Sequence, residues 1–174
     1  MADLNGKNVA IIATNGFEDS ELTSPKEAVE SAGATTKVVS TETGEIEGKK
    51  GAKVAVDAKT ADASVDEFDA LILPGGTINA DTIRTDADAV ALVKAFKDAG
   101  KPIGVICHGG WILAEADVLK GVTLTSVANV KTDLANAGAN WVDEEVVVDS
   151  GFISSRTPDD LPAFNATLVE EFAK

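Results

Sequence analysis

The chain has 174 residues, of which 44% are hydrophobic, and a formal net charge of −14 at pH 7. This length and composition suit a single domain, residues 1–174, with a proper hydrophobic core. The negative charge argues against nucleic acid or an anionic membrane surface as a partner. A single cysteine excludes an internal disulfide and fits a reducing compartment. Because the sequence shows no apolar signal segment and no apolar run of membrane length, we expect a cytoplasmic protein.

Strands and helices alternate along the sequence. Continuous apolar runs, which are typical of strands covered on both faces, predict strands at 9–13, 70–73 and 103–106. A further strand is expected at 35–40, where it completes a β-α-β unit with the first strand. Apolar residues at helical spacing predict helices over 22–32, 87–99, 111–114, 130–137 and 158–172. We expect Pro25 in the first turn of its helix, and Asp86 and Thr157 as helix caps.

Shorter elements complete the pattern. Glycine-punctuated alternation over residues 43–57 predicts a small antiparallel excursion beside the main sheet, and a strand is expected at 122–124. A turn at 149–151 joins two apolar segments, which predicts a hairpin near the end of the sheet. The whole pattern favours an α/β fold with a doubly wound, mostly parallel sheet.

The most informative stretch, residues 100–114, reads as a strand, a sharp turn and a helix, with Cys107 at the turn. Such a turn raises a side chain above the carboxyl end of a sheet and directs the free amides of the next helix toward it. A thiolate is the reactive form of cysteine, and a helix N-terminus or an imidazole stabilises it. A lone cysteine in a sheet is usually an inert core residue, but the strand–Cys-His-Gly-Gly–helix context favours a reactive thiol.

His108 is the only histidine in the chain, so any Cys–His pair must use it or its copy in another subunit. The alternative is a purely conformational role in the turn. One cysteine and one histidine leave only oxygen atoms to complete a metal site, so we expect no metal and no other cofactor.

Two further loops should meet Cys107 at the carboxyl edge of the sheet. Gly75 and Gly76 follow a strand, where their amides can bind a developing oxyanion together with the amide of His108, or simply form a turn. Glu18 and Glu21 lie at a helix start, where acids are common because of the helix dipole. A carboxyl there can also control the protonation of the thiol, in which case a protonated acid that donates a hydrogen bond is favoured.

The sequence resembles the DJ-1/PfpI superfamily, and in particular its branch of PfpI-like intracellular proteases and deglycases. The segments that carry the resemblance are 16–21, 68–76, 100–109, 141–149 and 154–161. The resemblance implies a flavodoxin-like three-layer sandwich that forms a homodimer or a hexamer.

The resemblance also implies roles for individual residues. Cys107 is the implied nucleophile with His108 as its partner, and Glu21 and Glu18 are the acids near it. Asp81 matches the carboxylate that a neighbouring subunit supplies to a catalytic triad. From the residues alone, Asp81 is equally well interpreted as the cap of a short turn over 82–84. The implied oxyanion- and substrate-binding positions are Gly75, Gly76 and Gly109.

The implied activity is that of a stress-protective cysteine hydrolase or lyase that acts on small carbonyl compounds, glycated proteins or peptides, as a glyoxalase, deglycase or protease. A second hypothesis is a non-catalytic, chaperone-like or redox-sensing stress protein with an oxidisable Cys107.

Overall fold

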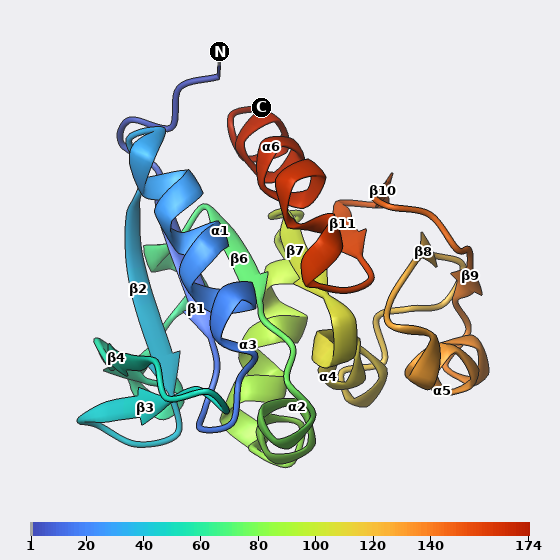
Figure 1. Ribbon diagram of the computed structural model, residues 1–174, viewed down its shortest axis with the longest axis horizontal. Coiled ribbons are helices and arrows are strands. Elements are labelled where there is room, and N and C mark those ends of the chain that lie inside the picture. The colour runs from blue at the N-terminus through green and yellow to red at the C-terminus, as the bar shows by residue number, and fades with distance from the viewer. Residues whose placement is uncertain (1) are drawn as a thin grey trace.

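A computed structural model describes residues 2–174 and has a seven-stranded sheet at its centre (Figure 1). Its spatial order is β10-β11-β7-β6-β1-β2-β5, and every neighbouring pair runs parallel except β10 and β11. The strands are β1 (Asn8–Ile12), β2 (Thr35–Ser40), β5 (Ala58–Lys59), β6 (Ala70–Leu73), β7 (Ile103–Ile106), β10 (Val147–Asp149) and β11 (Phe152–Ser155).

The connections place a crevice at the carboxyl edge of the sheet. Numbered along the chain, the five central parallel strands β1, β2, β6, β7 and β11 lie in the order 2-1-3-4-5, which is the flavodoxin-like order. The chain therefore leaves β1 in one direction and β6 in the other, so the loops after them separate. Ligands of open α/β sheets bind at such a switch point.

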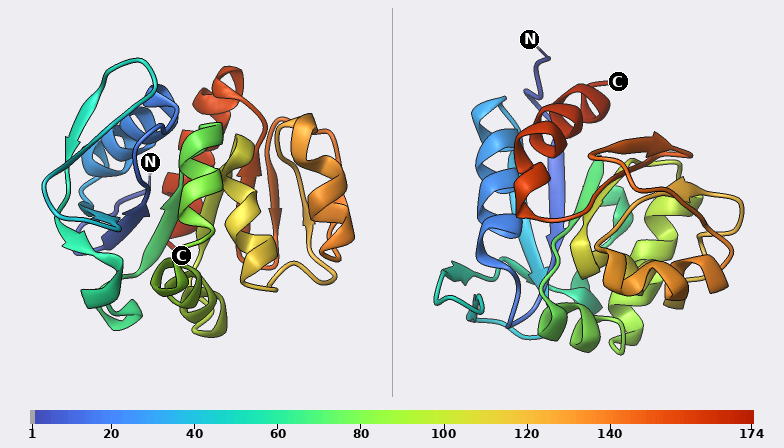
Figure 2. Two further views of the ribbon diagram at one scale, coloured as in Figure 1. Left: turned by 90° about the horizontal axis from the view of Figure 1, so that it is seen from below. Right: turned by 45° about the vertical axis from the view of Figure 1, so that its right-hand side comes forward.

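Helices cover both faces of the sheet, as the views in Figure 2 show, which confirms the three-layer α/β sandwich. One face carries α1 (Asp19–Ser31) and α6 (Leu161–Phe172), which pack side by side. The other carries α3 (Ala87–Asp98), α4 (Trp111–Glu115) and α5 (Lys131–Asn136).

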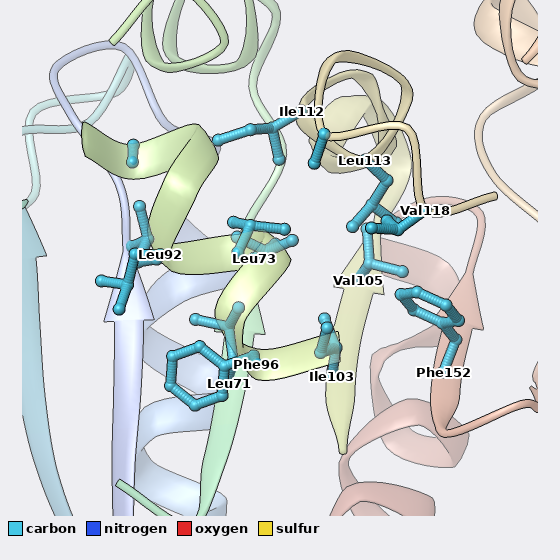
Figure 3. Packing of buried hydrophobic residues seen from close by; sticks show 14 of the residues in the cluster. Leu71, Leu73, Leu92, Phe96, Ile103, Val105, Ile112, Leu113, Val118 and Phe152 are labelled. Carbon is cyan, nitrogen blue, oxygen red and sulfur yellow. The ribbon is translucent and has the colours of Figure 1, made fainter. Parts of the chain in front are cut away.

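The strands divide their side chains between two cores. In β6, Leu71 and Leu73 face the α3 side, while Ala70 and Ile72 face the α1 side. This alternation follows from the two-residue repeat of a strand, and because both faces are covered the run is apolar throughout. Figure 3 shows the α3-side core, where Phe96 packs under β6 and β7.

The smaller predicted elements are present. The excursion is an antiparallel hairpin of β3 (Glu45–Glu47) and β4 (Lys53–Ala55), and β10 and β11 form the terminal hairpin. The strand expected at 122–124 is β8 (Thr123–Leu124), which pairs with β9 (Asn140–Trp141) outside the main sheet. No helix within residues 2–174 has both the length and the apolar character needed to cross a membrane.

Two local predictions are wrong. Helix α1 begins at Asp19, so Pro25 lies in its interior and not in its first turn; Pro25 is buried, and its missing N–H leaves the carbonyl of Glu21 without its helical donor. Residues 77–83 form a helix, α2 (Thr77–Ile83), so Asp81 lies inside a helix and does not cap a turn over 82–84.

The predicted caps are only partly correct. Asp86 and Thr157 occupy the positions before their helices, but neither side chain bonds the helix amides. Asp86 instead accepts a hydrogen bond from the hydroxyl of Thr60, which ties the β5 segment to α3. A side chain with a tertiary partner is not free to cap.

We predict that Phe96→Ala lowers the free energy of unfolding by about 3–5 kcal/mol, because it leaves a cavity beneath the sheet. Val148→Ala is the matched control, since Val148 is 47% exposed, and its effect should stay within about 0.5 kcal/mol. Urea denaturation followed by circular dichroism measures both. Equal effects in the two variants would contradict the packing described here.

Candidate active site

The turn after β7 is a sharp elbow with Cys107 at its apex. Cys107 has φ 61°, in the left-handed region that residues other than glycine rarely adopt. A short 3-10 turn, η3 (Cys107–Gly110), follows and leads directly into α4. Strained backbone of this kind is concentrated at functional sites. The elbow predicted from the sequence is confirmed, and it leaves the thiol half-buried at the carboxyl edge of the sheet.

Two backbone amides point toward the sulfur of Cys107. They belong to His108 and Gly76, and both lower the pKa of the thiol. Gly76 has φ 90°, and a side chain there would collide with the backbone of Glu18 and of Gly16. Only glycine lets this loop pack so closely against the loop after β1. Converging amides are the donors that oxyanion-binding sites use, and that role for this pair stays a prediction.

The other two predicted glycines have packing roles in this structure. The amide of Gly75 donates to Glu21 Oε1 at 3.0 Å, so it is already occupied. A side chain at Gly109 would lie 2.6 Å from the carbonyl oxygen of Leu73, so Gly109 lets the elbow rest against β6. A direct role of Gly75 or Gly109 in substrate binding stays a prediction.

Glu21 is a fully buried carboxyl group beside the thiol. It lies in the first turn of α1, which begins where the loop after β1 ends. Its Oε1 atom accepts from the amide of Gly75, and within residues 2–174 the only other polar group in direct interaction with the carboxyl is the thiol of Cys107. Burial, followed by the negative charge of Glu18, raises the pKa of Glu21 to about 7. Glu21 therefore holds a proton over most of the acidic range and can exchange it near neutrality.

Glu21 and Cys107 form a coupled acid pair. Burial raises the pKa of Cys107 to about 12, and the negative charge of an ionised Glu21 adds to this effect. That repulsion disappears when Glu21 is protonated, and the amides of His108 and Gly76 then favour the thiolate. Two acids in contact lose their protons in separate steps. Near neutral pH the pair therefore carries one negative charge and one proton.

His108 contacts the thiol, and Asp81 does not contact His108. The Nδ1 atom of His108 lies 3.3 Å from Cys107 Sγ, and its Nε2 atom lies 3.4 Å from the hydroxyl of Thr77. Burial and then the positive charge of Lys49 lower the pKa of His108, so the ring is neutral at pH 7. Asp81 lies on the exposed side of α2. A cross-subunit triad stays a prediction.

Glu18 is buried, but two lysines that the sequence analysis did not single out hold it. Lys49 and Lys50 both form ion pairs with its carboxylate, the second at 3.0 Å. Burial alone would raise the pKa of Glu18, but the hydrogen bonds and charges of the two lysines lower it. Glu18 is therefore ionised and Glu21 is the acid that titrates. Nothing in the spacing along the chain indicates these pairs, which depend on the β3–β4 hairpin folding back onto α1.

Asn79 is a second residue that the sequence analysis missed. It is buried in α2, donates to the carbonyl oxygens of Pro74 and Gly75, and accepts from the amide of Thr14 at 2.7 Å. It thus joins the loops after β1 and β6 at the switch point. A buried polar residue next to a Pro-Gly-Gly turn is a signal that could have indicated this role. Within residues 2–174, no three His, Cys, Asp or Glu side chains are grouped to hold a metal ion.

The coupled pair predicts a pH dependence. The pair loses its first proton as the pH rises through about 7; most of the resulting charge lies on Glu21, and a small fraction of the pairs carries it on the sulfur. Alkylation of Cys107 by iodoacetamide, which needs the thiolate, should therefore accelerate over this range. In Glu21→Gln this inflection should be lost, because glutamine does not titrate. The alkylation rate is measured by quenching the reaction at set times and quantifying the free thiol, which is unambiguous because the chain has a single cysteine. Identical pH profiles in the two proteins would show that Glu21 does not control the thiol.

Comparisons with known proteins agree with this geometry. A family model described as the DJ-1/PfpI family matches residues 7–171. An uncharacterized protein of Staphylococcus saprophyticus is 52% identical over 168 residues, which cover 95% of this chain and 97% of the relative. An uncharacterized protein of Staphylococcus aureus is 48% identical over 168 residues, which cover 95% of this chain and 98% of the relative.

Solved structures give the same result. A ThiJ/PfpI domain protein from Brachyspira murdochii has a TM-score of 0.89 at 29% identity, covering 98% of this chain and 97% of that one. A two-domain protein from Anabaena variabilis, with DJ-1/ThiJ/PfpI-like and ferritin-like domains, has a TM-score of 0.92 at 34% identity; the match covers 94% of this chain but 47% of the Anabaena chain. Since the family model spans nearly the whole sequence and the elbow lies where the resemblance implies, the chain belongs to the DJ-1/PfpI family.

Proposed function

We propose that the protein is a cysteine-dependent enzyme that converts small α-oxo aldehydes, and the adducts that they form with proteins, through attack by Cys107. The observation that carries this proposal is the buried Glu21 carboxyl, which interacts directly with the thiol of Cys107 and has a pKa raised to about 7. A general acid–base is most effective when its pKa lies near the working pH. The family includes proteases and deglycases, so cysteine chemistry on a carbonyl carbon is consistent with it.

The chemistry needs no external oxidant or reductant. The Cys107 thiolate forms a bond to the aldehyde carbon, and the carbonyl oxygen, held by the amides of Gly76 and His108, takes up a proton. Glu21 then removes the hydrogen of that carbon as a proton and returns it to the neighbouring ketone carbon. The result is a thioester with a new alcohol beside it. Water cleaves the thioester, which releases a 2-hydroxy acid and restores the thiol.

His108 has a supporting position in this scheme. Its neutral ring lies against the sulfur, so it can accept the thiol proton as the carbon–sulfur bond forms and can later pass it to the leaving thiol. The hydroxyl of Thr77 lies at the other ring nitrogen and limits rotation of the ring. Peptide hydrolysis is a related alternative that uses the same nucleophile. It would need Asp81 from a second subunit to orient His108.

Methylglyoxal consumption tests the proposal. We expect the wild type to convert methylglyoxal to lactate, Cys107→Ala to lose all turnover, and Glu21→Gln to lose about 10²–10⁴-fold in kcat because proton transfer is lost. Glu27→Gln is the matched control, since Glu27 is an exposed acid on the same helix, and it should retain full activity. Turnover that persists in Cys107→Ala would remove the thiol from the mechanism.

One observation favours a second candidate, a redox sensor. The half-buried Cys107 is accessible to a small oxidant, and the adjacent Glu21 carboxyl can donate a hydrogen bond to an oxidised sulfur when it is protonated. Two molecules of peroxide would convert the thiol to a sulfinic acid and leave two molecules of water.

We predict that mild peroxide adds two oxygen atoms to the wild type and none to Cys107→Ala, and that Glu21→Gln forms less sulfinate because it no longer offers a protonated carboxyl. Mass spectrometry of the intact chain measures the additions. Oxidation without any turnover of methylglyoxal or peptides would favour the sensor over the enzyme. Indiscriminate oxidation elsewhere in the chain would count against the sensor.

A further inference from the structure

Two lysines from the turn of the β3–β4 hairpin lie beside the thiol site. Figure 1 shows this hairpin and α2 at the edge of the molecule opposite both termini. Lys49 and Lys50 both reach the carboxylate of Glu18, one residue before α1, while their side chains remain 50% and 69% exposed. Lys50 also acts on the neighbouring carboxylate of Asp19, whereas Lys49 has Glu18 as its ion-pair partner. Both ammonium groups remain open to solvent.

The backbone of this turn is fixed onto the start of α1. The amide of Lys49 donates to the carbonyl of Phe17 at 2.9 Å. The carboxylate of Asp19 accepts from the amides of Lys50 and Ala52, at 3.0 and 2.9 Å. The side chain of Asp19 therefore points at the backbone of the hairpin turn. The lysines thus lie at a set position relative to α1, whose first turn also carries Glu21.

The charge of Lys49 acts on the site itself. Its strongest partner is Glu18, which raises its pKa, and the thiol of Cys107 and the carboxyl of Glu21 also act on it, so Lys49 is positively charged at neutral pH. Burial is the main cause that lowers the pKa of His108, and the positive charge of Lys49 adds to it. The ammonium group of Lys49 is therefore near enough to interact with both side chains of the elbow, Cys107 and His108, in a chain whose net charge is −14.

We propose that Lys49, assisted by Lys50, selects carbonyl compounds that carry a carboxylate, so that the preferred substrate is an anionic α-oxo aldehyde. This inference rests on the proposed function and names its substrate class. A concrete example is 4,5-dioxopentanoate. Its aldehyde carbon would be oxidised to a carboxylate and its ketone carbon reduced to an alcohol, with one water consumed, to give 2-hydroxyglutarate.

Alkylation of Cys107 by a charged and a neutral reagent tests the charge selection without any turnover. The rate constants for iodoacetate and iodoacetamide are measured on the same protein, and their ratio cancels any change in the amount of thiolate. We expect Lys49→Gln to lower the iodoacetate-to-iodoacetamide ratio by about five- to tenfold, because a unit charge near the sulfur is lost. High salt should lower the wild-type ratio in the same direction.

Two variants serve as controls. Lys49→Arg keeps the charge and should keep the ratio. Lys53→Gln removes an exposed lysine from β4 of the same hairpin, outside the Glu18 ion pairs, and should leave the ratio unchanged. An unchanged ratio in Lys49→Gln, or an equal fall in Lys53→Gln, overturns the inference.

Turnover of a matched pair of aldehydes separates this inference from the proposed function. The wild type should have a higher kcat/KM for 4,5-dioxopentanoate than for neutral 2-oxopentanal, and Lys49→Gln should lose about five- to tenfold with the first substrate only. Equal losses with both substrates overturn the charge selection and leave the enzyme intact. No turnover of either aldehyde overturns the proposed function, and the alkylation ratio alone then decides whether Lys49 selects anions.

Discussion

The left-handed backbone at Cys107 is the constraint on which the site depends. It ends β7 abruptly and turns the chain so that the sulfur, the amide of His108 and the loop after β6 converge. Convergence this close leaves no room for side chains on the facing backbone, and both Gly75 and Gly76 would collide with their neighbours if they carried one. The strain at one residue is balanced by the surrounding sheet, whose two cores fix β6 and β7 side by side.

Electrostatics then gives the two buried acids at the start of α1 different roles. Glu18 is held ionised by the lysines of the hairpin. Glu21, three residues further along, forms no ion pair within residues 2–174 and shares a proton with the thiol. Two carboxylates three residues apart thus differ in charge because of what packs against them. Acid and base assignments at active sites commonly arise from such environmental differences.

The sequence alone was enough to predict the sheet and the elbow, because apolar runs and a Cys-His-Gly-Gly turn are local signals. It failed where the outcome depends on distant partners. Helix α2 was missed because its few buried apolar residues give no clear stripe, and Pro25 was misplaced because α1 begins three residues before the expected start. Lys49 could not have been predicted as part of the site. It meets Glu18 only because the hairpin folds back onto the start of α1, and about 30 residues of chain separate the two partners.

The burial of Glu21 also has a thermodynamic cost for the whole molecule. Its pKa is about 7 in the folded chain, compared with the ordinary glutamate value of 4.5 that applies to the unfolded chain. The folded state therefore binds this proton more tightly than the unfolded state does. The stability that this provides is complete below pH 4.5 and is lost as the pH rises to about 7, which amounts to about 3 kcal/mol. A domain of this size has a total stability of only about 5–15 kcal/mol. Near neutral pH the free energy of unfolding is therefore measurably lower than in mild acid. This loss of stability accompanies a carboxyl that can exchange its proton at that pH.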